Sequence, residues 1–326
     1  MLIGSSREEL EKTQAENTAQ EDFSLFWQNT LEQMLPKENQ LSLTPYETPM
    51  KNVSTWDVTV AGFNNDPIRG WFLESITAPA LSPCIVIYDG YGGGRGLPHE
   101  WLFWVAAGYR VLVMDTRGQG GGFRLSDTPD GSYPRHSHSP GFMTQGILSP
   151  EDYYYRRVFV DAVAFVRAAQ NLKGVDPNRV IVAGGSQGGG IALAAASLSD
   201  GVFAAMPDVP FLSSFRRATE IVDTYPYHEI TTYLRVHRSE VAQVFKTLSY
   251  FDVTNLVTMA KVPALVSIGL HDPVCPPETI FAMRNRYAGK IDTEVYEFNT
   301  HEGGSVAHQL VQARWLEKLL TEKSAR

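Results

Sequence analysis

Hydrophobic residues first follow a helical period along this chain and then two strand-like runs. Between residues 23 and 35, apolar side chains recur every three to four positions until Pro36, which predicts a helix that ends there. Residues 53–60 and 68–73 are rich in β-branched and aromatic side chains, and the turn-forming sequence Asn-Asn-Asp-Pro at 64–67 separates them. This pattern predicts two antiparallel strands.

From residue 84 onward, short apolar runs alternate with longer helical patterns. The runs that predict strands are 84–88, 110–115, 180–183, 203–206, 264–269 and 293–298. The patterns that predict helices are 100–107, 153–172, 189–199, 278–287 and 306–322. Such alternation is typical of the α/β class, with a mostly parallel, twisted sheet that helices cover on both faces.

Two long stretches interrupt this alternation. Residues 120–150 form a connection rich in Gly, Ser and His, and residues 211–259 insert aromatic, largely helical sequence between two strands. Long connections of this kind are often functional. No linker divides the chain, so we expect one domain over residues 1–326, with an N-terminal extension (1–50) that includes a loop at 39–49.

Composition narrows the class of protein. With 326 residues, 43% of them hydrophobic, the chain can bury a large core. A net charge of −8 argues against binding to nucleic acid or an anionic membrane, and no apolar run is long enough to span a bilayer. There is no secretory signal pattern, and the two cysteines cannot make a disulfide framework. A cytoplasmic protein is the simplest interpretation.

One glycine-rich turn carries the strongest chemical signal. The strand predicted at 180–183 runs into Gly184-Gly185-Ser186-Gln187-Gly188, and a helix follows at once. This is the pattern Gly-x-Ser-x-Gly in the strand–turn–helix setting that exposes a nucleophilic serine. The alternative is a glycine-rich turn with an idle serine.

A serine nucleophile needs a base and a carboxylate that orients the base, and both follow later strands. Asp272 comes after the strand predicted at 264–269, and His301 comes after the one at 293–298. The order Ser186, Asp272, His301 therefore predicts a catalytic triad at the carboxyl edge of the sheet.

Other residues compete for these roles. Asp208 is the rival acid, because it follows the strand directly after the serine. His271 precedes the last strand and His308 falls on the final helix, so a structural role is expected for both. Glu302 beside His301 is expected to hold structure rather than to replace Asp272.

The oxyanion hole needs two backbone N–H groups. We assign them to Gln187, directly after the serine, and to Tyr91 in the glycine-rich loop after the strand at 84–88. The alternative for that loop, a phosphate-binding loop, lacks the required glycine spacing. The histidines and cysteines are scattered, so we expect neither a metal nor a cofactor.

Two further groups of residues complete the expected site. A substrate pocket is expected from bulky residues near the triad, namely Tyr91, Pro210, Phe211, Pro226 and Val274. Arg117, Gly118 and Gln119 are expected to tie loops together, with Glu302 as the candidate partner of Arg117, rather than to touch substrate.

Several motifs together resemble one known family. They are Asp115-Thr116-Arg117-Gly118-Gln119-Gly120, Gly184-Gly185-Ser186-Gln187-Gly188-Gly189 and His301-Glu302, with weaker matches at 153–156, 208–212 and 225–227. In this order they are similar to the acetyl xylan esterases and cephalosporin C deacetylases, carbohydrate esterase family seven of the α/β-hydrolases. The resemblance covers residue 22 to the C-terminus.

The resemblance implies an activity and an assembly. It implies deacetylation of small acetylated sugars, such as xylo-oligosaccharides, and removal of the 3′-acetyl group of cephalosporin C. It also places Ser186, Asp272 and His301 on the family's triad, and Tyr91 and Gln187 on its oxyanion hole. Finally, it implies a ring-shaped homohexamer with active sites that face an internal chamber.

Overall fold

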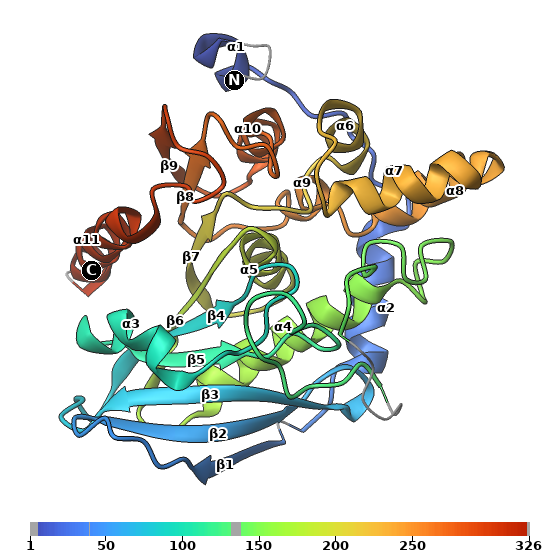
Figure 1. Cartoon of the computed structure of the whole chain (residues 1–326). Coiled ribbons are helices and arrows are strands. Elements are labelled where there is room, and N and C mark those ends of the chain that lie inside the picture. The colour runs from blue at the N-terminus through green and yellow to red at the C-terminus, as the bar shows by residue number, and fades with distance from the viewer. Residues whose placement is uncertain (1–5, 39, 132–137, 325–326) are drawn as a thin grey trace.

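A nine-stranded sheet in the order β1-β2-β3-β5-β4-β6-β7-β8-β9 runs through the molecule (Figure 1). The computed structural model describes residues 6–38, 40–131 and 138–324. The strands are β1 (Leu41–Pro45), β2 (Val53–Ala61), β3 (Pro67–Ser75), β4 (Ser82–Tyr88), β5 (Arg110–Met114), β6 (Val175–Gly185), β7 (Val202–Asp208), β8 (Ala264–Gly269) and β9 (Ile291–Tyr296). The six strands β5, β4, β6, β7, β8 and β9 pair in parallel in this spatial order. Strands β1, β2 and β3 form an antiparallel edge next to β5.

The predicted strands are all present, although β6 begins at Val175, five residues before the predicted start, and two further differences lie at the edges of the sheet. Residues 39–49 were expected to be a loop, but residues 41–45 form β1, which pairs with β2 along the edge of the sheet. Four of the five β1 residues are exposed, so this strand lacks the hydrophobic alternation that a half-buried strand shows. The last strand ends at Tyr296 instead of residue 298, and Phe298 is 86% exposed.

Helices cover both faces of the sheet, as expected (Figure 1). The α-helices are α1 (Arg7–Glu11), α2 (Phe23–Met34), α3 (Leu102–Ala106), α4 (Tyr154–Asn171), α5 (Gln187–Leu198), α6 (Phe215–Ile221), α7 (Tyr227–Val236), α8 (Val241–Ser249), α9 (Val253–Leu256), α10 (Pro277–Arg286) and α11 (Ser305–Ser324). Short 3₁₀ turns lie at η1 (Phe63–Asn65), η2 (Pro98–Trp101) and η3 (Arg238–Glu240). Over the described residues, no helix combines the length and apolar character that crossing a membrane requires.

The alternation of side chains along the central strands explains the two layers. On β6, Val180 and Val182 point into the core that α2, α4 and α5 cover, whereas Ile181 and Ala183 join the core beneath α3 and α11. Both sets are buried, so these strands read as continuous apolar runs in the sequence. The sheet is thus sealed on both sides, and its carboxyl edge is where loops can gather.

The N-terminal extension packs against the insertion at 211–259. Trp27 on α2 is 1% exposed, and its Nε1 donates a hydrogen bond to the carbonyl of Tyr250 at 2.8 Å. Its ring also lies edge-on to Phe251, with 5.5 Å between centroids. Segments more than 200 residues apart therefore form one aromatic core.

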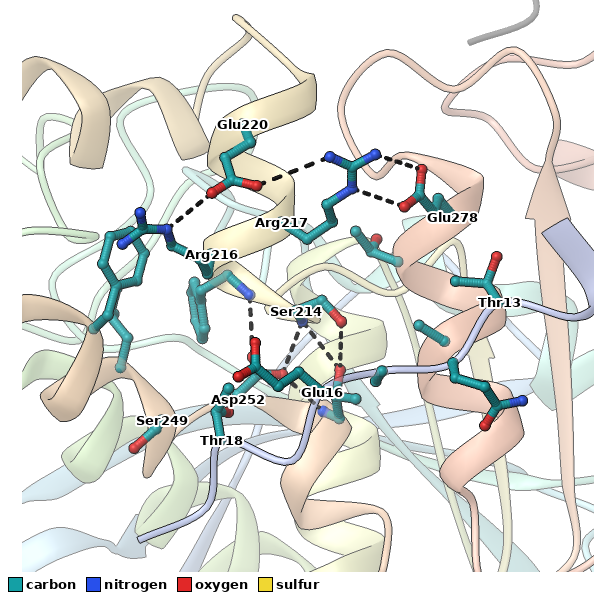
Figure 2. Close-up of a pocket in the computed structure, with 18 residues that line it drawn as sticks. Thr13, Glu16, Thr18, Ser214, Arg216, Arg217, Glu220, Ser249, Asp252 and Glu278 are labelled. Carbon is teal, nitrogen blue, oxygen red and sulfur yellow. Dashed lines mark hydrogen bonds and ion pairs between the residues drawn. The ribbon is translucent and has the colours of Figure 1, made fainter. Parts of the chain in front are cut away.

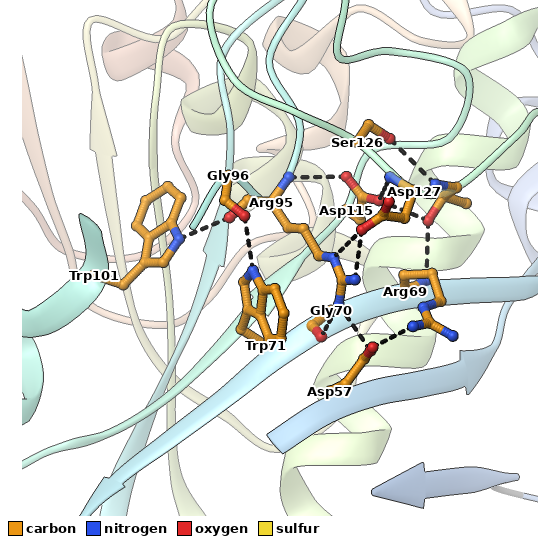
Figure 3. A network of polar contacts seen from close by, with 11 residues as sticks. Asp57, Arg69, Gly70, Trp71, Arg95, Gly96, Trp101, Asp115, Ser126 and Asp127 are labelled. Carbon is orange, nitrogen blue, oxygen red and sulfur yellow. Dashed lines mark hydrogen bonds and ion pairs between the residues drawn. The ribbon is translucent and has the colours of Figure 1, made fainter. Parts of the chain in front are cut away.

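A buried arginine ties the loops after β4 and β5 to the antiparallel edge (Figure 3). The guanidinium of Arg95 donates to Gly70 O at 2.7 Å, to Asp57 at 2.8 Å and to Asp127 at 2.6 Å. The backbone N–H groups of Arg95 and Asp127 both donate to Asp115, at 2.8 and 2.7 Å. Asp115, which opens the Asp-Thr-Arg-Gly-Gln motif, thus fixes two loops at once.

The next charged residue of this motif lies in a second buried cluster. Arg117 is fully buried and binds both oxygens of Asp161 on α4, at 2.6 and 2.8 Å, and Asp66 at 2.8 Å. The expected link to Glu302 is wrong. Glu302 is exposed and hydrogen-bonds within its own turn, whereas Asp161 is buried and offers the planar, two-point acceptor that a guanidinium fits best.

Replacing Arg117 by alanine should cost stability more than chemistry. The change leaves Asp161 buried without its counter-ion, which destabilises folded proteins by about 3–5 kcal/mol. Thermal unfolding should therefore shift to clearly lower temperature. The control Arg216→Ala removes an exposed pair with Glu220 and should cost less than about 1 kcal/mol. An unchanged melting temperature with a sharply reduced kcat would contradict this structural role.

A further buried acid lies at the start of the loop after β4. Asp89 is 6% exposed, and Arg124 donates to its Oδ1 at 2.7 Å, while its Oδ2 has no partner among the described residues. Burial outweighs this ion pair and raises the pKa of Asp89 from 3.8 to about 6. The folded protein therefore binds more protons at this site than the unfolded chain between about pH 4 and pH 6.

This difference predicts a pH dependence of stability. As the pH rises through that window, the Asp89 contribution to the free energy of unfolding should fall by about 2–3 kcal/mol. The melting temperature of the parent protein relative to Asp89→Asn should therefore decrease between pH 4.5 and pH 7.5.

A matched control uses the other acidic partner of Arg124. Although burial opposes the shift, hydrogen bonds from the Leu97 N–H and Arg124 lower the pKa of Glu100. The contribution of Glu100 therefore changes around and below pH 4.5, so the same comparison with Glu100→Gln should show almost no change in melting-temperature difference between pH 4.5 and pH 7.5. A constant difference between the parent protein and Asp89→Asn at every pH would refute the assignment.

Candidate active site

The turn between β6 and α5 holds Ser186 in a conformation that few non-glycine residues adopt. Its φ is 56° and its ψ is −119°. Two hydrogen bonds hold this backbone in place: the Ser186 N–H donates to Asp208 O at 2.8 Å, and the Phe211 N–H donates to Ser186 O at 2.9 Å. A Cβ at Gly184 or at Gly188 would clash with the carbonyl oxygen of Tyr88, whereas one at Gly185 would meet nothing within 4 Å. The outer glycines of the motif are therefore a packing requirement.

The three residues predicted as a triad meet above this turn. His301 Nε2 lies 2.9 Å from Ser186 Oγ, and His301 Nδ1 lies 2.8 Å from Asp272 Oδ2. Asp272 is fully buried, and its other oxygen accepts the N–H groups of Val274 and Cys275 at 2.8 and 2.9 Å. An ionised Asp272 fixes Nδ1–H as the donor, which leaves Nε2 free to accept the serine proton.

The competing residues have other partners. Asp208 accepts hydrogen bonds from Gln312 at 3.0 and 3.1 Å and lies 3.0 Å from His308 Nε2. His308 is 1% exposed and its Nδ1 contacts Tyr296 at 2.9 Å, so it is packed inside the protein. His271 stacks against Phe298. The structural roles expected for His271 and His308 fit these contacts.

Glu302 shapes the turn that carries His301. Its carboxylate accepts hydrogen bonds from Thr300 Oγ1 at 2.6 Å, the Thr300 N–H at 3.0 Å and Asn299 Nδ2 at 2.7 Å. These bonds, that from Thr300 Oγ1 above all, lower the pKa of Glu302 to about 2. The carboxylate is thus held ionised as a local brace for the histidine loop.

The two expected oxyanion donors lie on the turn after Ser186 and on the loop after β4. Gln187 is the first residue of α5, so its N–H has no intrahelical acceptor, and neither it nor the Tyr91 N–H donates to another described residue. Gln119 joins the two segments: its Oε1 accepts the Gly92 N–H at 2.7 Å, and its Nε2 donates to Gln187 Oε1 at 2.8 Å. This arrangement is consistent with the loop-tying role expected for Gln119.

Two tyrosines that sequence reasoning did not assign complete this buried amide pair. Tyr155 OH donates to Gln187 Oε1 at 2.8 Å, and Tyr154 OH lies 3.0 Å from Gln119 Nε2 and donates to Arg117 O at 2.5 Å. The run Tyr153-Tyr154-Tyr155 was visible in the sequence. Nothing in a helical pattern, however, showed that two of its hydroxyls reach the nucleophile turn.

The expected pocket residues differ in their surroundings. Val274 lies beside Asp272 and is half-buried, and the segment before Pro226 is tied to the Asp272 loop by Thr224 Oγ1 donating to Pro273 O. Pro210 is buried, and the fully buried ring of Phe211 packs against Tyr227, 4.2 Å between centroids. Phe211 therefore contacts the nucleophile turn through its backbone, while its ring belongs to the core.

Cys275 was not anticipated in the site. Its Sγ lies 3.9 Å from Ser186 Oγ, and burial raises the pKa of the thiol well above its ordinary value. Donor atoms of Asp272, Cys275 and His301 all lie within 4.8 Å of one another. Because the thiol stays protonated and the other two groups bond to each other, the cluster suits proton transfer better than metal binding.

A cavity of about 660 Å³ lies away from these residues (Figure 2). The segment 13–18, α6, α8 and α10 line it, and none of the triad residues does. Its arginines are already paired, Arg216 with Glu220 at 2.9 Å and Arg217 with Glu278 at 2.7 Å. Asp252 accepts three backbone N–H groups. These charged residues thus already have partners within the protein.

Comparison with known proteins agrees with this geometry. Residues 2–319 match the family model described as acetyl xylan esterase (AXE1). The chain is similar to the solved acetyl xylan esterase of a Paenibacillus species, with 38% identity, a TM-score of 0.89, and 96% and 99% of the two chains covered. It is also similar to acetyl xylan esterase 1 of a Thermoanaerobacterium species, with 30% identity, a TM-score of 0.86, and 97% and 99% covered.

A curated relative matches over a shorter stretch. It is an acetyl esterase of Xylanibacter ruminicola, 28% identical over 179 residues, which is 55% of this chain and 39% of that protein. The chain thus matches about two fifths of the length of this relative. The solved relatives confirm the α/β-hydrolase fold expected from the sequence. Because the family model spans nearly the whole chain, the protein belongs to the acetyl xylan esterase family of carboxylic ester hydrolases.

Proposed function

We propose that the protein hydrolyses acetyl esters of small acetylated sugars, xylo-oligosaccharides among them, through an acetyl-enzyme on Ser186. The observation that supports this most directly is the unbroken chain of hydrogen-bonding distances from Ser186 to His301 to Asp272. The same chemistry would remove the 3′-acetyl group of cephalosporin C.

The mechanism follows from the positions of the polar atoms. His301 Nε2 takes the proton of Ser186 as Oγ attacks the acetyl carbonyl, and Asp272 stabilises the imidazolium. The N–H groups of Tyr91 and Gln187 stabilise the oxyanion. The C–O bond then breaks, the sugar alcohol leaves with the proton from His301, and Ser186 carries the acetyl group. Water, deprotonated by His301, attacks this ester and releases acetate and the free serine.

Replacing the proposed nucleophile tests the function. Ser186→Ala should reduce kcat for p-nitrophenyl acetate by about 10⁴ to 10⁶, as loss of a triad serine does elsewhere. Ser197→Ala on the same helix α5, whose hydroxyl donates to Leu193 O one turn earlier, is the matched control and should leave kcat unchanged.

The substrate screen should include acetylated xylo-oligosaccharides, glucose pentaacetate, cephalosporin C and a peptide amide. We expect the first two to be deacetylated fastest. Near-normal hydrolysis by Ser186→Ala would overturn the mechanism. Faster cleavage of the peptide amide than of the sugar acetates would instead favour a peptidase.

Acyl-chain length gives a second test. Tyr91, Pro226 and Val274 are proposed to leave room for an acetyl group only, so kcat/KM should fall at least tenfold from p-nitrophenyl acetate to the butyrate. Val274→Ala should narrow this gap because it removes two methyl groups from the proposed wall. Butyrate cleaved as fast as acetate by the parent protein would rule out a tight acyl pocket.

The ring-shaped homohexamer implied by the family resemblance stays a prediction.

A further inference from the structure

The side chain of Tyr91 is held from the insertion. Its hydroxyl donates to Glu229 Oε1 at 2.6 Å and accepts the N–H groups of Gly141 and Phe142 at 3.1 and 3.0 Å. The other oxygen of Glu229 accepts the Met143 N–H at 3.1 Å. One carboxylate on α7 therefore joins the loop after β4 to the turn at 141–143.

Glu229 is an unusual residue to find here. It is 9% exposed, and no lysine, arginine or histidine of the described chain lies within ion-pair distance of it. Buried carboxylates without a cation are costly, and here burial raises the pKa of Glu229 above its ordinary value. Such a cost is tolerated most readily where the group serves the active site.

The same turn also reaches the second oxyanion donor. Tyr153 OH donates to Met143 O at 3.0 Å, and Tyr155 OH contacts Met143 Sδ at 3.5 Å while it donates to Gln187 Oε1. Glu229 thus contacts Tyr91 directly. It also contacts Met143, which touches Tyr155, and Tyr155 in turn donates to the side chain of Gln187. Both residues proposed to bind the oxyanion are braced from one point.

We propose that Glu229 is a positioning residue for the oxyanion hole: by holding the Tyr91 phenol against the 141–143 turn, it aims the Tyr91 backbone N–H at the ester carbonyl. The inference rests on the proposed function, because it concerns the same reaction. It gives the insertion at 211–259 a part in catalysis, since α7 supplies the carboxylate. The hydrogen bond to Tyr91 N–H matters most when the carbonyl becomes an oxyanion, so kcat should change more than KM.

Three single variants test this on p-nitrophenyl acetate. Tyr91→Phe keeps the backbone N–H and the ring but removes the contact with Glu229. Glu229→Ala removes the carboxylate, and Glu229→Gln keeps its shape but turns an amide N–H₂ toward either Tyr91 OH or Met143 N–H. We expect kcat to fall about 10- to 100-fold in the first two and less in Glu229→Gln, with KM within about twofold.

The double variant Tyr91→Phe/Glu229→Ala decides between positioning and independent effects. If the two side chains act through one contact, its kcat should match that of the worse single variant. The control pair is Tyr233→Phe and Glu240→Ala, which break another tyrosine–glutamate hydrogen bond of the insertion and should leave kcat within twofold. Melting temperatures identify the folded variants, and Tyr91→Phe with Glu229→Gln suffices if Glu229→Ala does not fold.

The outcomes separate this inference from the proposed function. A parent protein without esterase activity would refute the function itself. An active parent whose folded Tyr91→Phe and Glu229→Gln variants keep normal kcat would refute the inference alone. So would fully multiplicative losses in the double variant, or a raised KM with unchanged kcat.

Discussion

The site depends on one backbone constraint, the strained positive-φ conformation of Ser186 between β6 and α5. This conformation lifts the hydroxyl toward His301 and leaves the first N–H of α5 without an intrahelical partner. It persists because residues 180–183 before it and residues 187–196 after it are buried, and because Gly184 and Gly188 allow the Tyr88 carbonyl to approach. A residue in such a strained backbone conformation persists only when many surrounding contacts hold it there.

Those surroundings are unusually polar for the centre of a protein. The amides of Gln119 and Gln187 pair with each other below the turn, and buried carboxylates at Asp115 and Glu229 hold the loops around it. Each partner is satisfied by a specific donor, and such networks fix a unique geometry at a cost in stability. The molecule thus has a hydrophobic sheet core for stability and a hydrogen-bonded layer above it for precision.

Much of the fold and the triad could be predicted from the sequence, because the carboxyl ends of parallel strands lie at the same edge of the sheet. Ser186 and Asp272 follow strands with buried apolar runs, His301 follows the half-buried edge strand β9, and the carboxyl ends of these strands lie at the same edge of the sheet. Strand β1 escaped prediction because it lies at the edge and exposes most of its side chains. The partners of Arg117 escaped because Asp66 and Asp161 come from segments 51 and 44 residues away, and long-range pairing leaves no local trace.

The sequence also did not show which way the side chains of the insertion point. Glu229 is a charged residue on a short helix that also carries Tyr227 and Ile230, and a charged residue on such a helix ordinarily lies on the solvated face. In the structure it is turned inward because Tyr91 and the 141–143 turn supply donors that replace water. Phe211 differs in the opposite way: its position beside the nucleophile suggested the pocket, but its ring joins the core with Tyr227.

The central claim is that Ser186 carries the acetyl group during turnover, and trapping this intermediate tests it directly. Rapid acid quenching of the protein with excess p-nitrophenyl acetate, followed by peptide mass spectrometry, should find one added acetyl mass on the Gly184–Gly188 turn, at Ser186. An acetyl group found instead at Cys275 or elsewhere, with the peptide of Ser186 unmodified throughout steady-state turnover, would contradict the account.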